Sequence, residues 1–383
     1  MNKTSTLEDP LKVLIVAING YGHYYLKTLL EEIDCEKAVL AGVVDPEAER
    51  SMYFKAFKEF GIPVYNGMND FYLSGGKADL AVIVSPPHYH VSQSIFALHH
   101  GTNVLCEKPI GALVSDAELL IEKRNESGKF VMIGYQWSYS DGIQLLKKDI
   151  LEGRFGKPLR MKSLCLWPRD FAYFARNNWA YRKSDPEGNL VMDNIFQNAV
   201  SHFIHNMFFL LGDTMETSTD AVEIEAQISR AYPLETYDTG AFSAFTRSGV
   251  ELLFLGSHVA EKRIDPCFRI EFGKGFVELK PGADKIIAKT PDKKEFSYPS
   301  PDSDHQFKKL FMAIDNVHKP DKIICPVEAA LSQTRLANAV DKLCGDAQKI
   351  PDNKIVRTKE RLFVKGLDDL FLSGYRNFKL VKW

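Results

Sequence analysis

The sequence has few of the features that mark a specialised class of protein. Its six cysteines are scattered over 383 residues and never form a C-x-x-C pair. This spacing argues against a zinc ribbon or a dithiol redox site, and we predict no metal centre. Several cysteines lie in apolar runs, as free thiols of a reducing compartment do, so we expect a cytoplasmic protein.

The sequence also has little net charge and no long apolar run. The formal net charge is -2, which gives neither a basic field for nucleic acid nor an acidic tail for a basic partner. No stretch approaches the ~20 apolar residues that span a membrane. Met1–Pro10 is polar and acidic, unlike a secretory signal. We therefore expect neither a nucleic-acid partner nor a membrane.

Short apolar runs alternate with helical patterns in the first third of the chain. A chain of this length exceeds the roughly 250–300 residues that one core supports, so two domains are expected. Strand followed by helix predicts a Rossmann-type, doubly wound parallel sheet within residues 1–134. The expected strands are Lys12–Ala17, Val39–Val44, Leu80–Val84, Val104–Leu105 and Phe130–Ile133.

After Gly134 the pattern becomes rich in β-strands. A long helix is expected over Asp193–Leu211, closed by Gly212. At least six short strands follow between residues 222 and 289, separated by glycine-containing turns. Residues 135–383 are therefore predicted to form an α+β domain with a large, open, mainly antiparallel sheet. The exposed face of such a sheet predicts a homodimer or homotetramer.

The turn after the first strand is the candidate dinucleotide site. The G-x-G-x-x-G fingerprint lets backbone approach a pyrophosphate at a helix N-terminus, and here only its third glycine is kept, as Gly22. Asp45 follows the second strand at the spacing of the acid that binds the ribose hydroxyls, and its charge favours NAD over NADP. The alternative is an empty strand–helix turn. The expected cofactor contacts are Ala17, Asn19, Gly20, Tyr21, Gly22 and Asp45.

Two further strand ends lie at the carboxyl edge, where ligands bind in such sheets. One reads Ser85-Pro86-Pro87-His88-Tyr89-His90, and the other reads Cys106-Glu107-Lys108-Pro109. Lys108 could reach both a nicotinamide ribose and a substrate hydroxyl. Taken alone, the first segment is equally a stiff loop and the second a solvated turn.

Together these motifs resemble one family. Glu107-Lys108-Pro109, Ser85-Pro86-Pro87 with His90, and Asp45-Pro46 are similar to the pattern of glucose-fructose oxidoreductases and inositol dehydrogenases, the Gfo/Idh/MocA family. The resemblance covers about residues 12–343. It implies a Rossmann domain, a domain built on an open sheet, bound NAD(H) or NADP(H), and sugar or polyol substrates. It adds Ser85, Pro86, His90, Glu107 and Lys108 to the expected cofactor contacts.

The expected helix in the second domain carries a polar stripe. Asn198, His202 and His205 stand at positions i, i+4 and i+7. In the family this helix usually has Asp, His and Asp at these places, so the resemblance implies that His202 is catalytic, Asn198 assists it and His205 contacts substrate. The alternative is that such histidines only pack in a core. A metal held by both histidines would lack an evident third ligand.

A segment between the domains combines aromatic and cationic side chains. Aromatic faces stack on sugars, and arginine binds hydroxyl groups, so a carbohydrate pocket is one interpretation. Packing of a long loop, with arginines stacked on aromatic rings, is the other. The expected substrate contacts are Trp167, Arg169, Trp179 and Arg182, beside His205.

These residues predict hydride transfer between NAD and a hydroxyl-bearing carbon of a sugar or polyol. His202 acts as general base, Lys108 holds the hydroxyl, and Asn198 orients one or both. Two alternatives remain open. One is a glycosidase or lyase that oxidises its sugar transiently, and the other is a dinucleotide-binding sensor without catalysis.

Overall fold

A computed structural model describes residues 9–320 and 322–382, so the expectation for Met1–Pro10 lies almost wholly outside the described residues. The chain forms two compact units. The first contains residues up to 110, 118–134 and 307–327, and the second contains residues 111–117, 135–306 and 328 onward. The predicted boundary at residue 134 therefore leaves out one feature of the fold: the chain comes back to the first unit, which residues 307–327 complete.

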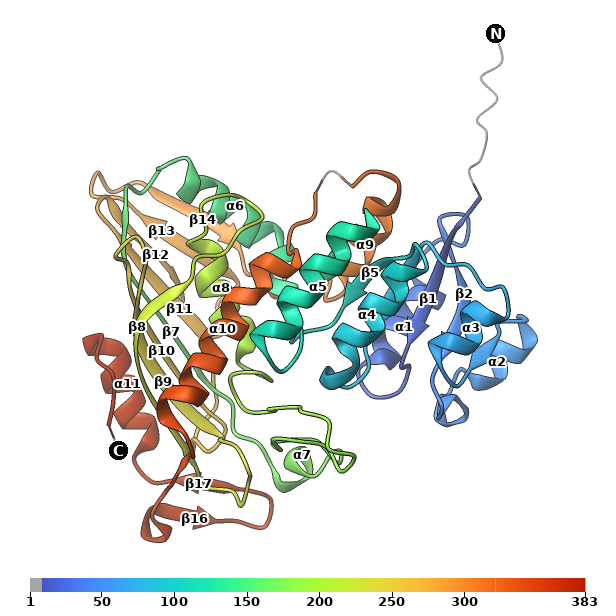
Figure 1. Cartoon of the computed structure of the whole chain (residues 1–383). Helices are drawn as coiled ribbons and strands as arrows, with labels where there is room; N and C mark the ends of the chain where they lie inside the picture. The colour runs from blue at the N-terminus through green and yellow to red at the C-terminus, as the bar shows by residue number, and fades with distance from the viewer. Residues whose placement is uncertain (1–8, 321, 383) are drawn as a thin grey trace. The chain divides into compact units, whose positions relative to one another are not determined.

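The first unit is built on a parallel sheet of six strands in the order β3-β2-β1-β4-β5-β6. All four residues of β4 are buried, which explains why this strand is apolar at every position. The doubly wound fold class is confirmed (Figure 1). The strands are β1 (Leu11–Val16), β2 (Ala38–Val44), β3 (Val64–Tyr65), β4 (Leu80–Ile83), β5 (Asn103–Cys106) and β6 (Val131–Ile133).

Helices connect these strands. After β2 the chain forms a short 3-10 turn, Ala48–Arg50, and then α2, which are separated because Ser51 adopts an extended backbone between them. The helices are α1 (Gly22–Glu31), α2 (Phe54–Glu59), α3 (Met68–Leu73), α4 (His90–His99), α5 (Val114–Ser127) and α9 (Lys308–His318).

The second unit is built on a nine-stranded sheet in the order β14-β13-β12-β11-β7-β10-β9-β8-β15. Its pairings are antiparallel except for β7 with β10 and β8 with β15. The prediction of a large, mainly antiparallel sheet is confirmed. The strands are β7 (Pro158–Leu166), β8 (Ala221–Arg230), β9 (Thr239–Thr246), β10 (Glu251–Ser257), β11 (Ile264–Phe272), β12 (Gly275–Leu279), β13 (Lys285–Lys289), β14 (Glu295–Pro299) and β15 (Gln348–Lys349).

Helices lie on both faces of this sheet. Figure 1 shows α8 (Ser201–Leu210) and α10 (Val327–Cys344) on one face and α11 (Leu367–Asn377) on the other. Leu164 and Leu253 of the sheet pack in one apolar cluster with Leu367 and Phe371 of α11. The buried Lys162 donates to the Tyr375 carbonyl at 2.6 Å. The face predicted to be open is therefore partly covered by the chain's own C-terminal segment, in which β16 (Ile355–Arg357) pairs with β17 (Leu362–Val364).

The helix predicted over Asp193–Leu211 is shorter than expected, because α8 begins only at Ser201. The Asn194 side chain accepts hydrogen bonds from the backbone amides of Phe196 and Gln197, at 2.9 and 3.1 Å. Such local bonds compete with helical ones. Residues 195–200 form irregular turns, and Asn198 lies on a turn rather than on the helix.

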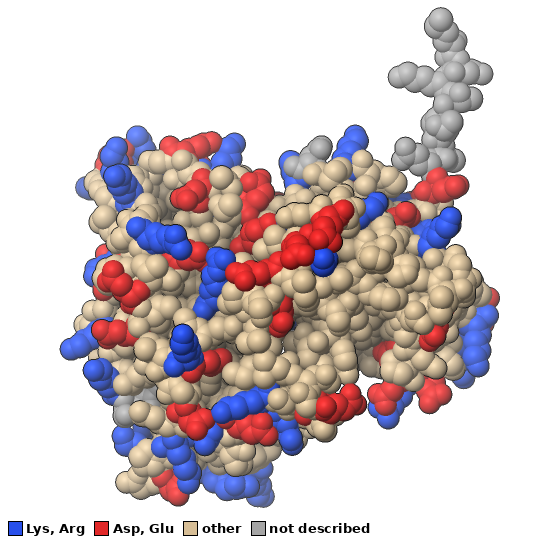
Figure 2. Space-filling model, viewed as in Figure 1, with Lys and Arg blue, Asp and Glu red and all other residues tan. Residues whose placement is uncertain are grey.

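No helix within residues 9–320 and 322–382 is long and apolar enough to cross a membrane. Basic and acidic side chains are interspersed on the face drawn in Figure 2. The cytoplasmic location stays a prediction.

Candidate functional site

The turn between β1 and α1 has the backbone that a pyrophosphate site requires. Ala17 has a φ of 65° and Gly20 a φ of 60°, so alanine stands in the left-handed conformation where the fingerprint has its first glycine. A Cβ on Gly22 would lie 2.0 Å from the Ala17 carbonyl oxygen, which explains the third glycine. Open space surrounds the Cβ position of Gly20. The turn therefore leaves room for phosphate close to its backbone at the N-terminus of α1.

Asp45 holds this turn together. Its Oδ2 accepts from the Ile18 and Asn19 amides, at 2.9 and 3.3 Å, and from Asn19 Nδ2 at 3.1 Å, while its Oδ1 accepts from the Glu47 amide at 2.8 Å. Only 7% of Asp45 is exposed. The acid that was expected to bind ribose thus organises the phosphate turn, and Asn19 is positioned by it. Whether Asp45 also accepts a ribose hydroxyl stays a prediction.

His90 ties two turns of the first unit together. One ring nitrogen lies 2.7 Å from the Pro109 carbonyl oxygen, and the other lies 2.8 Å from that of Ser85. The ring is buried, so both of its polar atoms are engaged by protein. The ring thus fixes the Ser85–Pro86 turn against the Lys108–Pro109 turn, and a direct cofactor contact by His90 stays a prediction. The Ser85 hydroxyl donates to Gln93 Oε1 at 2.5 Å.

Glu107 forms a buried ion pair that the sequence does not reveal. Its Oε1 accepts from the Tyr25 hydroxyl at 2.6 Å and from the ammonium of Lys309, on α9. Lys309 also donates to the Gly134 carbonyl at 3.0 Å. A Cβ on Gly134 would lie 2.8 Å from Glu107 Oε1, so a larger residue there would require the carboxylate to move. Although burial alone raises the pKa of Glu107, the Lys309 charge and these hydrogen bonds outweigh it and hold the pKa below its usual value.

Lys108 follows this pair directly. Its backbone amide donates to Glu107 Oε2 at 3.1 Å, which ties the position of Lys108 to the buried carboxylate, and its peptide bond to Pro109 is cis. The Lys108 side chain is half-buried. Lys108 belongs to the first unit, and His202 and Asn198 belong to the second. Their meeting in one active site stays a prediction.

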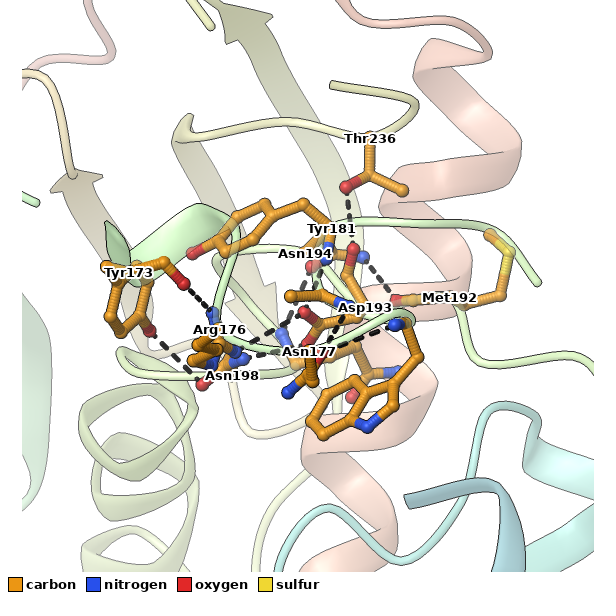
Figure 3. A network of polar contacts seen from close by, with 12 residues as sticks. Tyr173, Arg176, Asn177, Tyr181, Met192, Asp193, Asn194, Asn198 and Thr236 are labelled. Carbon is orange, nitrogen blue, oxygen red and sulfur yellow. Dashed lines mark hydrogen bonds and ion pairs between the residues drawn. The ribbon is translucent and has the colours of Figure 1, made fainter. Parts of the chain in front are cut away.

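Asn198 is held in a polar network of the second unit (Figure 3). Its Nδ2 donates to Asp193 Oδ1 at 2.9 Å, and its Oδ1 accepts from the Tyr173 hydroxyl at 3.4 Å. The buried Asp193 also accepts from the Tyr181 amide at 2.7 Å and pairs with Arg176 at 3.7 Å. Because a carboxylate only accepts hydrogen bonds, Asp193 fixes which way the Asn198 amide points. A charge is thus present one hydrogen bond away from the position where the family usually has Asp.

The two histidines of α8 have different surroundings. His202 is half-buried, and its ring meets that of Tyr135 edge-on at 5.7 Å. His205 is only 1% exposed, stacks on Tyr135 at 4.0 Å, and its Nε2 lies 2.9 Å from Ser138 Oγ. Burial, reinforced by the Lys147 charge, lowers the pKa of His205 to about 3. These surroundings favour the packing alternative for His205, and the substrate contact there stays a prediction.

The aromatic and cationic segment forms an alternating stack. Going along it, the Arg169 guanidinium lies 5.3 Å from the Trp167 ring and 4.5 Å from the Tyr173 ring. The Arg176 guanidinium lies 4.2 Å from the Tyr173 ring and 5.6 Å from the Trp179 ring. This arrangement, which we call the arginine–aromatic stack, brings together three of the four substrate contacts predicted in this segment. Arginines stacked on aromatic rings were the packing alternative, and a substrate role for them stays a prediction.

Arg182 stands apart from this stack. Its side chain is 51% exposed and pairs with Glu235 at 3.8 Å. Exposed pairs of this kind contribute little, so nothing in its surroundings supports the predicted substrate contact.

Residues 11–135 match the profile described as an oxidoreductase family with an NAD-binding Rossmann fold, Gfo/Idh/MocA. This first third of the chain is therefore similar to that family. The match confirms the family predicted from the Glu107-Lys108-Pro109 and Ser85-Pro86-Pro87 motifs, and with it the NAD-binding type of the first domain.

Several known proteins are similar to the chain. A 2,7-anhydro-N-acetylneuraminate hydratase from Mediterraneibacter gnavus is 27% identical over 217 residues, which are 55% of this chain and 52% of that protein. An inositol 2-dehydrogenase from Salmonella typhimurium is 29% identical over 152 residues, 39% of this chain and 44% of that protein. The matches thus span about half the length of these curated relatives.

The fold has solved counterparts over a greater length. The WlbA dehydrogenase from Bordetella pertussis, solved in complex with NADH and UDP-GlcNAcA, superposes with a TM-score of 0.71 at 20% identity. The superposition covers 87% of this chain and 96% of that one. Both domains of the chain therefore have the fold of these dehydrogenases.

Proposed function

We propose that the chain is an NAD-dependent oxidoreductase that moves a hydride between nicotinamide and a hydroxyl-bearing carbon of a sugar or polyol. The observation that carries the proposal is the match of residues 11–135 to the NAD-binding oxidoreductase family, together with a turn whose backbone fits a pyrophosphate. Lys108 and His202 stand where the resemblance places the reacting groups.

The turn Ala17–Gly22 would hold the pyrophosphate, with Asp45 keeping the turn in shape. NAD, when bound, supplies the hydride-accepting ring. His202 takes the proton of the substrate hydroxyl as general base, a task that imidazole commonly performs near neutral pH. Lys108 holds the same hydroxyl oxygen and stabilises negative charge on it. Asn198 orients the hydroxyl, and Asp193 fixes the direction of the Asn198 amide.

Replacement of the two reacting groups tests this proposal. We expect Lys108→Ala and His202→Ala each to lower kcat by at least ~100-fold, because general acid–base groups contribute on that order. The affinity for NAD, measured from the quenching of protein fluorescence, should change little in both variants. Near-normal turnover in both would contradict the mechanism, and loss of NAD binding would show that the residues serve the cofactor instead.

The hydratase relative favours a second candidate. In a transient-oxidation enzyme the sugar carbon is oxidised, an elimination or hydration follows, and the hydride returns, so NAD is recovered at the end. Product analysis beside absorbance at the NADH wavelength separates the two candidates. Accumulation of NADH in step with product supports the dehydrogenase, whereas product without net NADH supports the second candidate.

A further inference from the structure

Arg169, in the middle of the arginine–aromatic stack, carries a charge that the protein does not balance. Its neighbours in the stack are paired: Arg176 lies 3.7 Å from the Asp193 carboxylate, and Arg263, 5.2 Å from the Trp167 ring, lies 2.7 Å from Asp265. Within residues 9–320 and 322–382, by contrast, Arg169 forms no ion pair, and its buried Nε has no hydrogen-bond partner.

The carboxylates beside the stack are engaged by other residues: Asp265 by Arg263 and the Trp167 ring nitrogen, and Asp193 by Arg176. The nearby His258 is buried, and its Nδ1 lies 2.8 Å from the Trp167 carbonyl oxygen, so this nitrogen carries the proton and Nε2 is an acceptor. In the described part of the chain this Nε2 has no partner. Burial, together with the charge of Arg169, lowers the pKa of His258 to about 3, so the ring is neutral. His258 therefore neither repels an anion nor replaces one.

The position of Arg169 relates it to the proposed site. Tyr173, on whose ring the guanidinium lies at 4.5 Å, donates its hydroxyl to Asn198 Oδ1. Arg169 is thus one aromatic ring away from a residue that we place beside the substrate hydroxyl. The two rings also hold the guanidinium in one orientation, so a ligand would meet a fork that is already ordered.

We propose that Arg169 binds the carboxylate of the substrate, and that the substrate is therefore an acidic sugar of the uronate class. A single unbalanced guanidinium matches the single charge of a carboxylate, with which it can form two parallel hydrogen bonds. A phosphate would bring a second charge that finds no further unpaired cation in the stack. The inference that the ligand is a sugar rests on the proposed function. The preference of Arg169 for a carboxylate does not depend on it.

Matched acidic and neutral sugars test the inference with the full-length protein. Binding of D-glucuronate and D-galacturonate is compared by calorimetry with that of D-glucose and D-galactose, in low salt and saturating NAD. We expect at least one acid to bind ~10–100-fold more tightly than its neutral counterpart, the size of a lost charge-assisted pair. Arg169→Gln should remove this preference, so that the acid and its neutral counterpart bind with affinities within about threefold of each other.

The control is Arg335→Gln, an exposed arginine of α10 that pairs with Asp220 at 3.1 Å, and this variant should keep the preference for the acid. If neither acid binds more tightly than its neutral sugar to the unaltered protein, the inference is wrong, and this comparison requires no variant to fold. If Arg169→Gln folds and keeps the preference, the inference is equally wrong.

The same sugars separate this inference from the proposed function. If neutral and acidic sugars are oxidised with equal efficiency and NADH accumulates, the proposed dehydrogenase activity is supported and the carboxylate site is contradicted. Acid binding that depends on Arg169, without NADH from any of the four sugars, would support the carboxylate site and count against hydride transfer.

Discussion

Asn198 stands where the resemblance leads one to expect an aspartate. The structure nevertheless has a carboxylate next to this position, that of Asp193. The buried Asp193 accepts a hydrogen bond from Asn198 at 2.9 Å. Because the carboxylate takes the Nδ2 hydrogen bond, Asn198 Oδ1 is turned towards the Tyr173 hydroxyl, from which it accepts at 3.4 Å. The pair as a whole, rather than residue 198 alone, corresponds to the family's acid.

Substitution of Asn198 by aspartate should therefore harm the enzyme, although it restores the family's residue. Asn198→Asp places two carboxylates at hydrogen-bond distance, so one of them must hold a proton. We expect kcat/KM at pH 7 to fall by about 10–100-fold, a loss of ~1.4–2.7 kcal/mol, and to fall less at pH 5. The pH–rate profile measures this.

The exchange variant Asp193→Asn with Asn198→Asp is the matched control. It keeps one carboxylate and one amide in contact and should recover most of the lost activity. Equal losses of kcat/KM in Asn198→Asp and in the exchange variant would contradict the idea that the Asp193 carboxylate takes the place of an acid at position 198.

His205 should make stability sensitive to acid. Its pKa is about 3 in the folded protein and near 6.5 in the unfolded chain, so only the unfolded chain takes up a proton between these values. The stabilisation is complete above pH 6.5 and is lost as the pH falls, by at most ~1.4 kcal/mol per pH unit for one group. Urea unfolding of the unaltered protein and of His205→Gln, at pH 4.5 to 7.5, measures the difference. Parallel pH dependences in the two proteins would refute this assignment.

Among the elements, α9 has the most far-reaching role. Its Lys309 neutralises the buried Glu107 beside the predicted catalytic lysine, and 202 residues separate the two. Burial alone lowers the pKa of Lys309, but the Glu107 charge outweighs it and raises the pKa. Both groups are therefore charged, and neither can be removed alone without leaving a buried charge.

Removal of Lys309 should thus destabilise the first unit. We expect Lys309→Met to lower the free energy of unfolding by about 3–5 kcal/mol, since Glu107 is then left buried without its partner. The double variant Glu107→Gln with Lys309→Met removes both charges and should be more stable than Lys309→Met alone. Chemical denaturation of the unaltered protein and the two variants tests this, and a double variant no more stable than Lys309→Met would show that the buried charge is not the cause.

Elements dictated by local patterns were predictable, and those set by distant contacts were not. The wholly apolar run at β4 and the glycine-bounded strands of the second sheet need no partner to be recognised. The start of α8 was misplaced, because Asn194 captures backbone amides that a helical pattern would assign to the helix. The return of α9 to the first unit has no local signal, since it rests on contacts between residues far apart in the chain, such as Lys309 with Glu107.

At the scale of the whole molecule, α11 occupies part of the sheet face on which we expected subunits to meet. Leu367 and Phe371 cover Leu164 and Leu253, and Lys162 is capped by the Tyr375 carbonyl. A homodimer or homotetramer stays a prediction, and it would use the part of this face beyond α11 or another surface.

Removal of α11 should expose that face. A chain ending at Lys365 uncovers a contiguous apolar surface, and such surfaces drive association. We expect sedimentation velocity to show larger species for the shortened chain than for the full-length protein at equal concentration. The full-length variant Leu370→Ala, which alters a partly buried position of the same helix, serves as control and should sediment like the parent. Identical sedimentation of the shortened and full-length chains would show that α11 does not shield an association surface.

The candidate site divides in the same way. The positions of Gly22, Asp45 and Lys108 at turns and strand ends could be predicted, because such turns are recognised from residues adjacent in the sequence. Asp193 and Tyr173 could not, because their importance depends on which way a side chain points after folding. The pairing state of Arg169 is likewise invisible in the sequence, where each of its neighbours looks like a possible partner.

The return of α9 also has a consequence for the order in which the protein is made. Lys309 reaches the Gly134 carbonyl across 175 residues of chain, nearly all of which build the other unit. At a synthesis rate of ~5–20 residues per second, the nascent first unit waits roughly 10–35 s for the cation that Glu107 needs. On the ribosome the N-terminal domain is thus the first to be made but not the first that can be finished, and the second domain has the chance to fold while its predecessor is still incomplete.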